Sequence, residues 1–311
     1  MNTIREAIND YLIMRRGLGF KLVQDEHFLQ NFASFMEARG ASHVTTELAL
    51  EWALQPKGCS IGHPAKRLIA VRGFTRYRFA VDPLTEIPMP DLLPRRHDRA
   101  RPYLYSEAEI VNLMRAAAAL PPSDGLRGAT YYCLFGLLAV TGLRLGEALA
   151  LKCRDVDLQQ GLLTIRGAKF DRSRLVPLHA STQQVLSDYA RRRDVYQRRH
   201  TLAPFFISEH GGPLSADTVH RTFCKLSRQI GLRGPQDGHG PRLHDMRHRF
   251  ATETLLRWYR SGHDVERHLP VLSTFLGHSS VADTYWYVSA CPELMGEAVR
   301  RLEQRWGGTL S

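Results

Sequence analysis

The stretch His244-Asp245-Met246-Arg247, in the last third of the chain, decides how the rest of the sequence is interpreted. Leu276-Gly277-His278 and Tyr287 follow it, and Thr141-Gly142-Leu143-Arg144-Leu145-Gly146-Glu147 precedes it with a second arginine. Two arginines can neutralise the equatorial oxygens of a phosphorane, histidines can transfer protons, and a tyrosine hydroxyl can attack phosphorus. Together these residue types predict cleavage of a phosphodiester backbone without a metal ion.

The composition is that of an ordinary soluble protein with an excess of positive charge. The 311 residues are 43% hydrophobic and 23% charged, with a net charge of +11 and a pI near 9.7. This length suffices for two domains, and the charge makes a polyanion the expected partner, the alternative being a basic enzyme without one. The five cysteines form no C-x-x-C pair, which favours a reducing cytoplasm over a disulfide framework or a zinc knuckle.

We expect neither a targeting signal nor a membrane span. The N-terminal residues run directly into an amphipathic pattern, and the longest apolar stretch, Ala129 to Val140, is too short to cross a bilayer. The sequence therefore predicts a cytoplasmic protein that associates with the nucleoid when bound to DNA.

Residues 1–93 are predicted to form a helical domain. Apolar side chains recur at helical spacing from Ile4 to Leu12 and again further along the segment. A later helix, predicted over residues 64–80, carries Arg72 and Arg76 one turn apart, so both side chains lie on one face. We expect this face to contact DNA phosphates, the alternative being an ordinary solvent-exposed helix face.

Residues 94–102 are predicted to be a basic linker between two domains. Prolines interrupt the helical pattern around it, and it contains Arg95, Arg96 and two further arginines. A positively charged strap at this place would close a clamp around duplex DNA; the alternative is a solvated spacer.

Residues 103–290 are predicted to form a second domain, mostly helical with one small sheet. Ser106 with Glu109 is predicted to cap the start of a helix. A buried helix ends at Thr141-Gly142, and residues 162–165 and 174–178 have the pattern of a β-hairpin that carries Lys169. Residues 291–311 are predicted to form a C-terminal helix and tail, whose apolar face, which includes Met295 and Val299, either packs on its own domain or is exchanged between protomers. The fold class is therefore mainly α with a small β-sheet.

Arg144 is predicted to enter a helix just after a buried one, a rigid support that directs a guanidinium toward a phosphate. Glu147, three residues later, would orient it; the alternative is a surface ion pair of little consequence. Lys169 could protonate a departing oxygen if neighbouring cations lower its pKa, although a hairpin lysine is more often solvent-exposed. Tyr287 needs nearby positive charge to attack phosphorus, and Tyr285 is its local competitor.

A metal site is the rival interpretation of the histidines. His244 and His248 stand at i and i+4, as in the zinc-protease pattern H-E-x-x-H. Asp245 would be a short general base, Arg247 would repel a metal ion, and the spacing points to no third ligand. We therefore expect no metal and no cofactor, and keep a zinc hydrolase only as a minor alternative.

These motifs resemble those of the tyrosine recombinases, the phage-integrase and Xer-like family. Thr141 to Arg144 with Glu147 resembles the first arginine box of the family, and His244 to His248 resembles its H-x-x-R box. Tyr287 follows His278 by nine residues, the usual interval in the family, whereas Tyr285 follows it by seven. Lys169 lies five residues before Arg174, in the place of the family's hairpin lysine. All six catalytic positions are thus filled, and the resemblance implies an active enzyme.

The resemblance implies a helical, SAM-like core-binding domain and an α+β catalytic domain that close as a clamp on double-stranded DNA. It also implies that Tyr287 forms a 3′-phosphotyrosyl link, while Arg144, Arg247 and His278 stabilise the phosphorane. His244 would assist proton transfer, and Lys169 would protonate the 5′-oxygen. Members act as tetramers that exchange a C-terminal segment, here Cys291 to Trp306, and partner recombinases or accessory proteins are possible.

The leading hypothesis is a site-specific recombinase for integration, excision or transposition of DNA. A type IB-like topoisomerase uses similar chemistry and is the nearest alternative, ahead of a DNA-binding regulator without catalytic activity. The segment Arg15 to Phe20 faintly resembles transposon-associated relatives.

Overall fold

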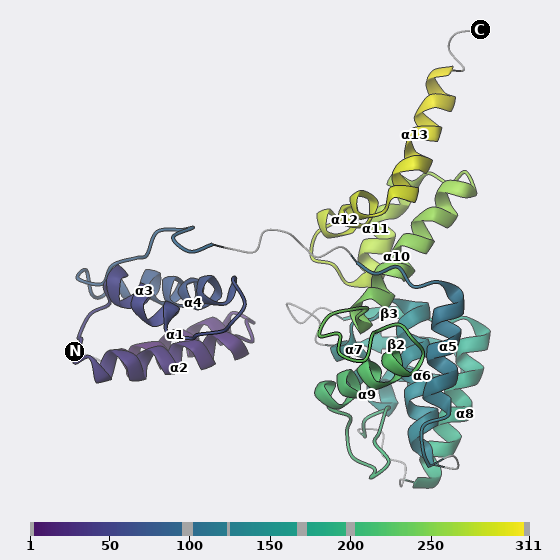
Figure 1. The fold of residues 1–311 in the computed structure, drawn as a ribbon, viewed down its shortest axis with the longest axis horizontal. Coiled ribbons are helices and arrows are strands. Elements are labelled where there is room, and N and C mark those ends of the chain that lie inside the picture. Colours follow the sequence, from purple (N-terminus) through teal and green to yellow (C-terminus); the bar gives the residue numbers. More distant parts are fainter. Residues whose placement is uncertain (1–2, 95–101, 123–124, 167–172, 197–202, 308–311) are drawn as a thin grey trace. The chain divides into compact units, whose positions relative to one another are not determined.

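The computed structural model describes residues 3–94, 102–122, 125–166, 173–196 and 203–307, apart from some side chains between 288 and 307. The chain divides into two compact units, Met1–Ala100 and Arg101–Ser311 (Figure 1). The predicted fold class, mainly helical with a small sheet, is confirmed.

The first unit is a small helical bundle. Its described helices are α1 (Ile4–Gly17), α2 (Val23–Ala38), α3 (Thr46–Leu54) and α4 (His63–Arg78). A capping box between Thr3 and Glu6 begins α1. The aromatic ring of Trp52 packs edge-on against Phe32 at 5.0 Å, and the Arg67 guanidinium covers the other side of Trp52 at 3.7 Å. An apolar core with one stacked arginine therefore holds the bundle together.

The second unit contains the remaining elements in chain order. They are α5 (Glu107–Ala118), α6 (Leu126–Thr141), α7 (Leu145–Ala150), η1 (Cys153–Asp155), β1 (Val156–Asp157), β2 (Leu162–Ile165), β3 (Arg174–Pro177), α8 (Ala180–Tyr196), α9 (Ala216–Gln229), α10 (Leu243–Arg260), α11 (Val265–Leu276), α12 (Ala282–Ala290) and α13 (Pro292–Gly307). The predicted capping box at Ser106 is present at the start of α5.

The sheet is antiparallel with strand order β1-β2-β3. The predicted hairpin pairs Leu163 with Val176 and Ile165 with Arg174, so apolar side chains of alternate residues enter the core. Strand β1 was not expected, because two residues carry too short a pattern to recognise. Lys169 lies outside the described residues.

Helix α10 links two apolar clusters of the second unit. Leu243 and Met246, near its start, belong to the main core, in which α6 packs against α5, α8 and α10. Leu255 and Leu256, further along, belong to a second cluster formed with α11, α12 and α13. His244, Arg247 and His248 therefore lie on the part of α10 between the residues of the two clusters, and Figure 1 shows the course of this helix.

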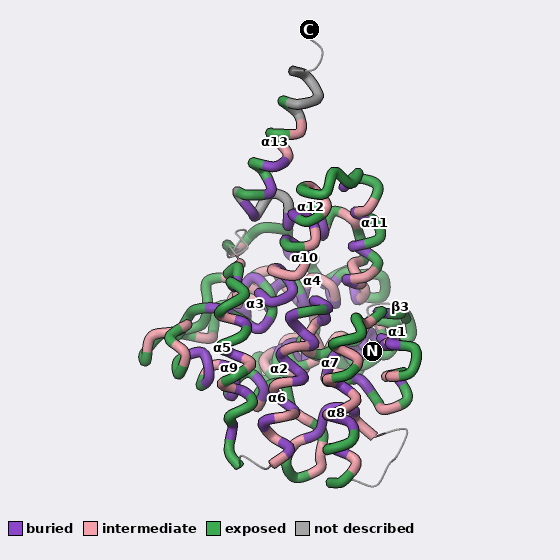
Figure 2. Tube along the Cα trace, turned by 90° about the vertical axis from the view of Figure 1, so that its right-hand side faces the viewer, coloured by how far each residue is buried: buried purple, intermediate pink, exposed green. Residues whose placement is uncertain are grey.

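Helix α13 packs on α10 within its own unit. Leu294 is fully buried, and Glu297 pairs with Arg300 at 2.8 Å. Arg301 donates to the carbonyl oxygen of Tyr259, near the end of α10, at 3.1 Å. Buried and exposed residues alternate along the first turns of α13 (Figure 2). Met295 and Val299, expected on the apolar face, stay exposed, and exchange between protomers remains a prediction.

Candidate active site

Two helix ends made possible by glycine form the base of the site. Helix α6 ends at Gly142 with φ +61°, and α11 ends at Gly277 with φ +67°, both in the left-handed region that glycine adopts without strain. Arg247 lies between the two ends and donates to the carbonyl oxygens of Gly142 at 2.8 Å and Leu276 at 2.7 Å. Helix C-termini carry partial negative charge, which offsets the burial of this guanidinium, only 2% exposed.

Arg144 is the N-cap of α7, and its side chain also reaches the C-terminal end of α11. Its Nη1 donates to Glu147 Oε1 at 2.9 Å and to the carbonyl oxygen of Gly277 at 3.1 Å. Its side chain is 41% exposed, so part of the guanidinium is open to a ligand. The predicted contact between Arg144 and Glu147 is present, and Glu147 is nearly buried, unlike a partner in a surface ion pair.

A third arginine joins this group, which was not predicted as a site residue. Arg174, the first residue of β3, donates from Nη2 and Nη1 to the two oxygens of Glu147 at 2.8 and 3.1 Å. Burial raises the pKa of Glu147, but the hydrogen bonds from Arg174 and the charges of both arginines outweigh it and lower the pKa. The sequence did contain one indication of this role: the alternation of residues along the strand places Arg174 on the same face as the buried Val176.

His278 follows Gly277 directly and is neutral at neutral pH. Its Nδ1 lies 2.7 Å from Thr284 Oγ1, which fixes the ring. Burial, with the charges of Arg247 and Arg144, lowers the pKa of His278 to about 4. A neutral imidazole can accept a proton or a hydrogen bond without adding charge to the site.

His244 and His248 occupy successive turns of α10, with ring centroids 4.8 Å apart and nearly perpendicular planes. His248 is buried against Trp286 and Tyr287, and burial lowers its pKa to about 4. His244 is exposed, but partial burial of its ring and the positive charge of Arg247 lower its pKa. Only His244 of the pair is thus accessible to a substrate.

Tyr287 and Tyr285 are in different environments on α12. Tyr287 is 3% exposed, and its ring stacks on His278 with a centroid distance of 5.9 Å and an interplanar angle of 19°. It also interacts with Arg247, which opposes the lowering of the Arg247 pKa by burial. Tyr285 is 53% exposed. The structure therefore brings Tyr287, rather than Tyr285, to the predicted arginines and histidines.

The remaining predicted residues lie outside the described part of the second unit. Lys169, Arg95 and Arg96 lie outside the described residues. Arg72 is half-buried and Arg76 exposed on α4, in the first unit, so their predicted contact with DNA remains untested.

Neither a group of metal ligands nor a membrane-spanning helix is found in the described part of the chain. No three histidine, cysteine, aspartate or glutamate side chains there are grouped to hold a metal ion, so the His244/His248 pair has no third ligand. None of the helices described is both long and apolar enough to cross a membrane.

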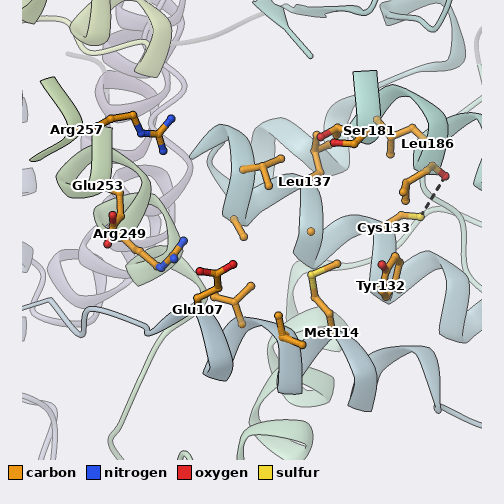
Figure 3. A pocket seen from close by; sticks show the side chains of 17 residues that line it. Glu107, Met114, Tyr132, Cys133, Leu137, Ser181, Leu186, Arg249, Glu253 and Arg257 are labelled. Atoms are coloured by element: carbon orange, nitrogen blue, oxygen red, sulfur yellow. Dashed lines mark hydrogen bonds between the residues drawn. The ribbon is translucent and has the colours of Figure 1, made fainter. Parts of the chain in front are cut away.

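A separate cavity of about 480 Å³ lies between α5, α6, α8 and α10. Its lining includes Glu107, Tyr132, Leu137, Arg249 and Glu253, and Figure 3 shows the α10 side chains along one side of it. None of the predicted site residues contributes to it. The chemistry is therefore expected at the open arginine cluster and not in this cavity.

Comparisons with known proteins identify the family of the chain. Residues 104–293 match the model of the Phage integrase family. The chain is 57% identical over 310 residues to a Sinorhizobium fredii protein named as integrase/recombinase y4rB, covering 98% of this chain and 99% of that protein. It is 28% identical over 315 residues to the tyrosine recombinase XerD of Mycobacterium tuberculosis, and the match covers 96% of this chain and 94% of that protein. The fold is similar to that of the Tn1549 transposon integrase in complex with transposon right end DNA, with a TM-score of 0.67 and 17% identity. The match covers 96% of this chain and 98% of that one.

Proposed function

The chain belongs to the phage integrase family of tyrosine recombinases and is a site-specific DNA recombinase, and we propose that Tyr287 is the residue that attacks the DNA backbone. The observation that carries this assignment is the packing of Tyr287 against His278 beside Arg247, while Tyr285 is largely exposed. A phenol in contact with a buried guanidinium has the positive charge nearby that its attack requires.

The arginines supply the charge that the reaction needs. The exposed part of Arg144 and the adjacent Arg247 would bind the non-bridging oxygens of the scissile phosphate. Negative charge on these oxygens grows as the phosphorane forms, so preorganised guanidinium groups stabilise the transition state more than the ground state. Removing one such donor costs about 10²–10³-fold in rate in other enzymes.

Proton transfer is assigned to the histidine and the lysine. The Tyr287 oxygen forms a bond to phosphorus as its proton passes to the neutral imidazole of His244, and the bond from phosphorus to the 5′-oxygen breaks. Lys169 would donate the proton that the 5′-oxygen takes up. The product is a 3′-phosphotyrosyl link and a free 5′-hydroxyl, and attack by another 5′-hydroxyl reverses the chemistry on a new strand. The phosphodiester energy is kept in the covalent bond, so neither ATP nor a metal ion takes part.

We also propose that four copies act together on two duplexes. Exchange of both strands of two duplexes requires four cleavages, and each chain contributes one tyrosine. The net charge of +11 supports binding of double-stranded DNA, in which Arg72, Arg76, Arg95 and Arg96 would contact phosphates. Identity of 57% to a protein named as an integrase/recombinase supports movement of DNA elements as the biological role.

Covalent trapping on nicked DNA tests the assignment of Tyr287. The purified chain is incubated in EDTA with a pool of nicked duplexes of randomised sequence, and DNA that stays attached to protein in SDS is recovered and sequenced. Wild type and Tyr285→Phe should form the adduct on one common sequence, whereas Tyr287→Phe should form none. An adduct on Tyr287→Phe would refute the assignment, and adducts without a common sequence would indicate a relaxing topoisomerase.

A further inference from the structure

We propose that Arg174 is a positioning residue for strand cleavage, which holds Glu147 and the end of α11 together so that Arg144 faces the phosphate. This proposal rests on the proposed function, since it assigns Arg174 to the same reaction. Arg174 differs from Arg144, whose side chain is 41% exposed, in that its own side chain is only 8% exposed and its Nε, Nη1 and Nη2 all donate to protein acceptors.

The end of α11 binds three arginines through three successive carbonyl groups. Arg174 Nε donates to Phe275 at 2.8 Å, Arg247 Nη2 donates to Leu276 at 2.7 Å, and Arg144 Nη1 donates to Gly277 at 3.1 Å. His278 is the next residue. Displacement of this short segment would therefore move the acceptors of all three guanidinium groups and the histidine together.

Glu147 binds two of these arginines, Arg144 and Arg174. Its Oε1 accepts from Arg144 Nη1 at 2.9 Å and from Arg174 Nη1 at 3.1 Å. Its Oε2 accepts from the Arg144 main-chain N–H at 3.0 Å and from Arg174 Nη2 at 2.8 Å. Without Arg174 the carboxylate would be free to turn toward Arg144 alone and to draw its guanidinium away from the phosphate.

Only an arginine has the geometry for this position. The guanidinium fork spans both oxygens of Glu147 while Nε, on its third edge, reaches the Phe275 carbonyl. A lysine ammonium would form some of these hydrogen bonds but could not span β3, α7 and α11 at once. Arg174 thereby fixes the relative positions of these three elements.

The test compares Arg174→Ala and Arg174→Lys with the matched control Arg193→Ala. Arg193 is also buried and also donates to a carboxylate, Asp194, and to a main-chain carbonyl, Phe205, but it lies on α8 and contacts none of the described site residues. Each full-length variant is mixed with the nicked duplex that wild type selects, and the single-turnover rate of adduct formation is measured across DNA concentrations. Thermal unfolding gives the folded fraction at the assay temperature.

Arg174→Ala should lower the rate at saturating DNA by about 10²-fold, the usual effect of misplacing a catalytic group by about 1 Å. The DNA concentration for half-maximal rate should stay within about threefold, because Arg174 does not contact DNA, and Arg174→Lys should recover part of the rate. Arg193→Ala should cleave at the wild-type rate when folded. Adding Arg174→Ala to Arg144→Ala should cause a smaller further loss than Arg174→Ala causes alone, because part of the effect of Arg174 acts through Arg144.

Three results would overturn the positioning role: wild-type cleavage by Arg174→Ala, an equal loss in Arg193→Ala, or a full further loss in the double variant. Failure of the proposed function is seen separately. It would appear as absence of an adduct with wild type, or as an adduct with Tyr287→Phe, whatever the Arg174 variants do.

Discussion

Substitution of Gly277 by alanine should disable the site without replacing any charged residue. A Cβ atom at this position would lie 2.5 Å from Arg174 Nη1 and 2.7 Å from its Cζ, both too close for real contacts. The guanidinium is the end of a long side chain, but here it is buried and held by Glu147 and Phe275. The new methyl group must therefore displace it from these partners.

Gly262 provides the control for the backbone. It also has a left-handed conformation, with φ +73° against +67° at Gly277, but a Cβ atom there would meet nothing within 4 Å. Forcing alanine into this region costs about 1–2 kcal/mol, and a less flexible unfolded chain returns about 0.4–1 kcal/mol. Gly262→Ala should therefore lower the free energy of unfolding by about 1 kcal/mol.

Gly277→Ala should lower the free energy of unfolding by the same backbone contribution and, in addition, by the loss of the Arg174 interactions. Breaking a buried ion pair costs about 3–5 kcal/mol, and the lower end applies because the guanidinium moves and is not removed. We expect Gly277→Ala to be less stable than Gly262→Ala by about 3 kcal/mol. Cleavage should fall by about 10²-fold only in Gly277→Ala.

Urea-dependent hydrogen exchange of peptides from α10 and α11 measures this stability separately from that of the first unit. The rate of adduct formation is measured on the same samples, at urea concentrations where both variants are folded. Equal stability of the two variants, together with wild-type cleavage by Gly277→Ala, would show that Arg174 is not held as described.

Three further predictions concern charge. Glu147→Gln should slow adduct formation by about 10–10²-fold with DNA binding retained, because two guanidinium groups lose their shared carboxylate; unchanged single-turnover rates would contradict this. The pKa of His248 is about 4 when folded and ordinary when unfolded, so unfolding takes up protons and stability should fall as pH drops from about 6.5 to 4. Between pH 7.5 and pH 5, the urea midpoint of unfolding should fall less in His248→Phe than in wild type. An equal fall in both proteins would contradict this prediction. Arg76→Ala should reduce the slope of log Kd against log salt by about 1, unlike Arg39→Ala, whose arginine pairs with Glu51; equal slopes would place Arg76 away from DNA.

Local features were predictable from the sequence because their causes are local. Ser106 with Glu109 forms the expected capping box, Gly142 ends the expected buried helix, and the hairpin strands lie where alternation placed them. The predicted helix over 64–80 is observed from His63 to Arg78, a difference confined to its ends. Residue types at family spacing were enough to name candidates on α7, α10 and α12.

The contacts that organise the site could not be predicted in this way, because they join distant parts of the chain. Arg247 binds a carbonyl 105 residues away, and Arg174 binds one 101 residues away. A guanidinium that donates to backbone carbonyls leaves no pattern in the acceptor's sequence, since any residue supplies a carbonyl. In the sequence, Arg174 therefore indicated only the position of Lys169, and its own role became visible from its contacts in the fold.

The charge balance of the cluster gives a reason for its composition. Three guanidinium groups and one carboxylate, kept ionised by its lowered pKa, leave two net positive charges, while His278 and His248 stay neutral. A phosphodiester carries one negative charge and a phosphorane carries two, so this excess matches the transition state better than the substrate. A protonated histidine would bind the ground state more tightly and reduce that difference. The low histidine pKa values and the single carboxylate thus act in the same direction, toward faster cleavage.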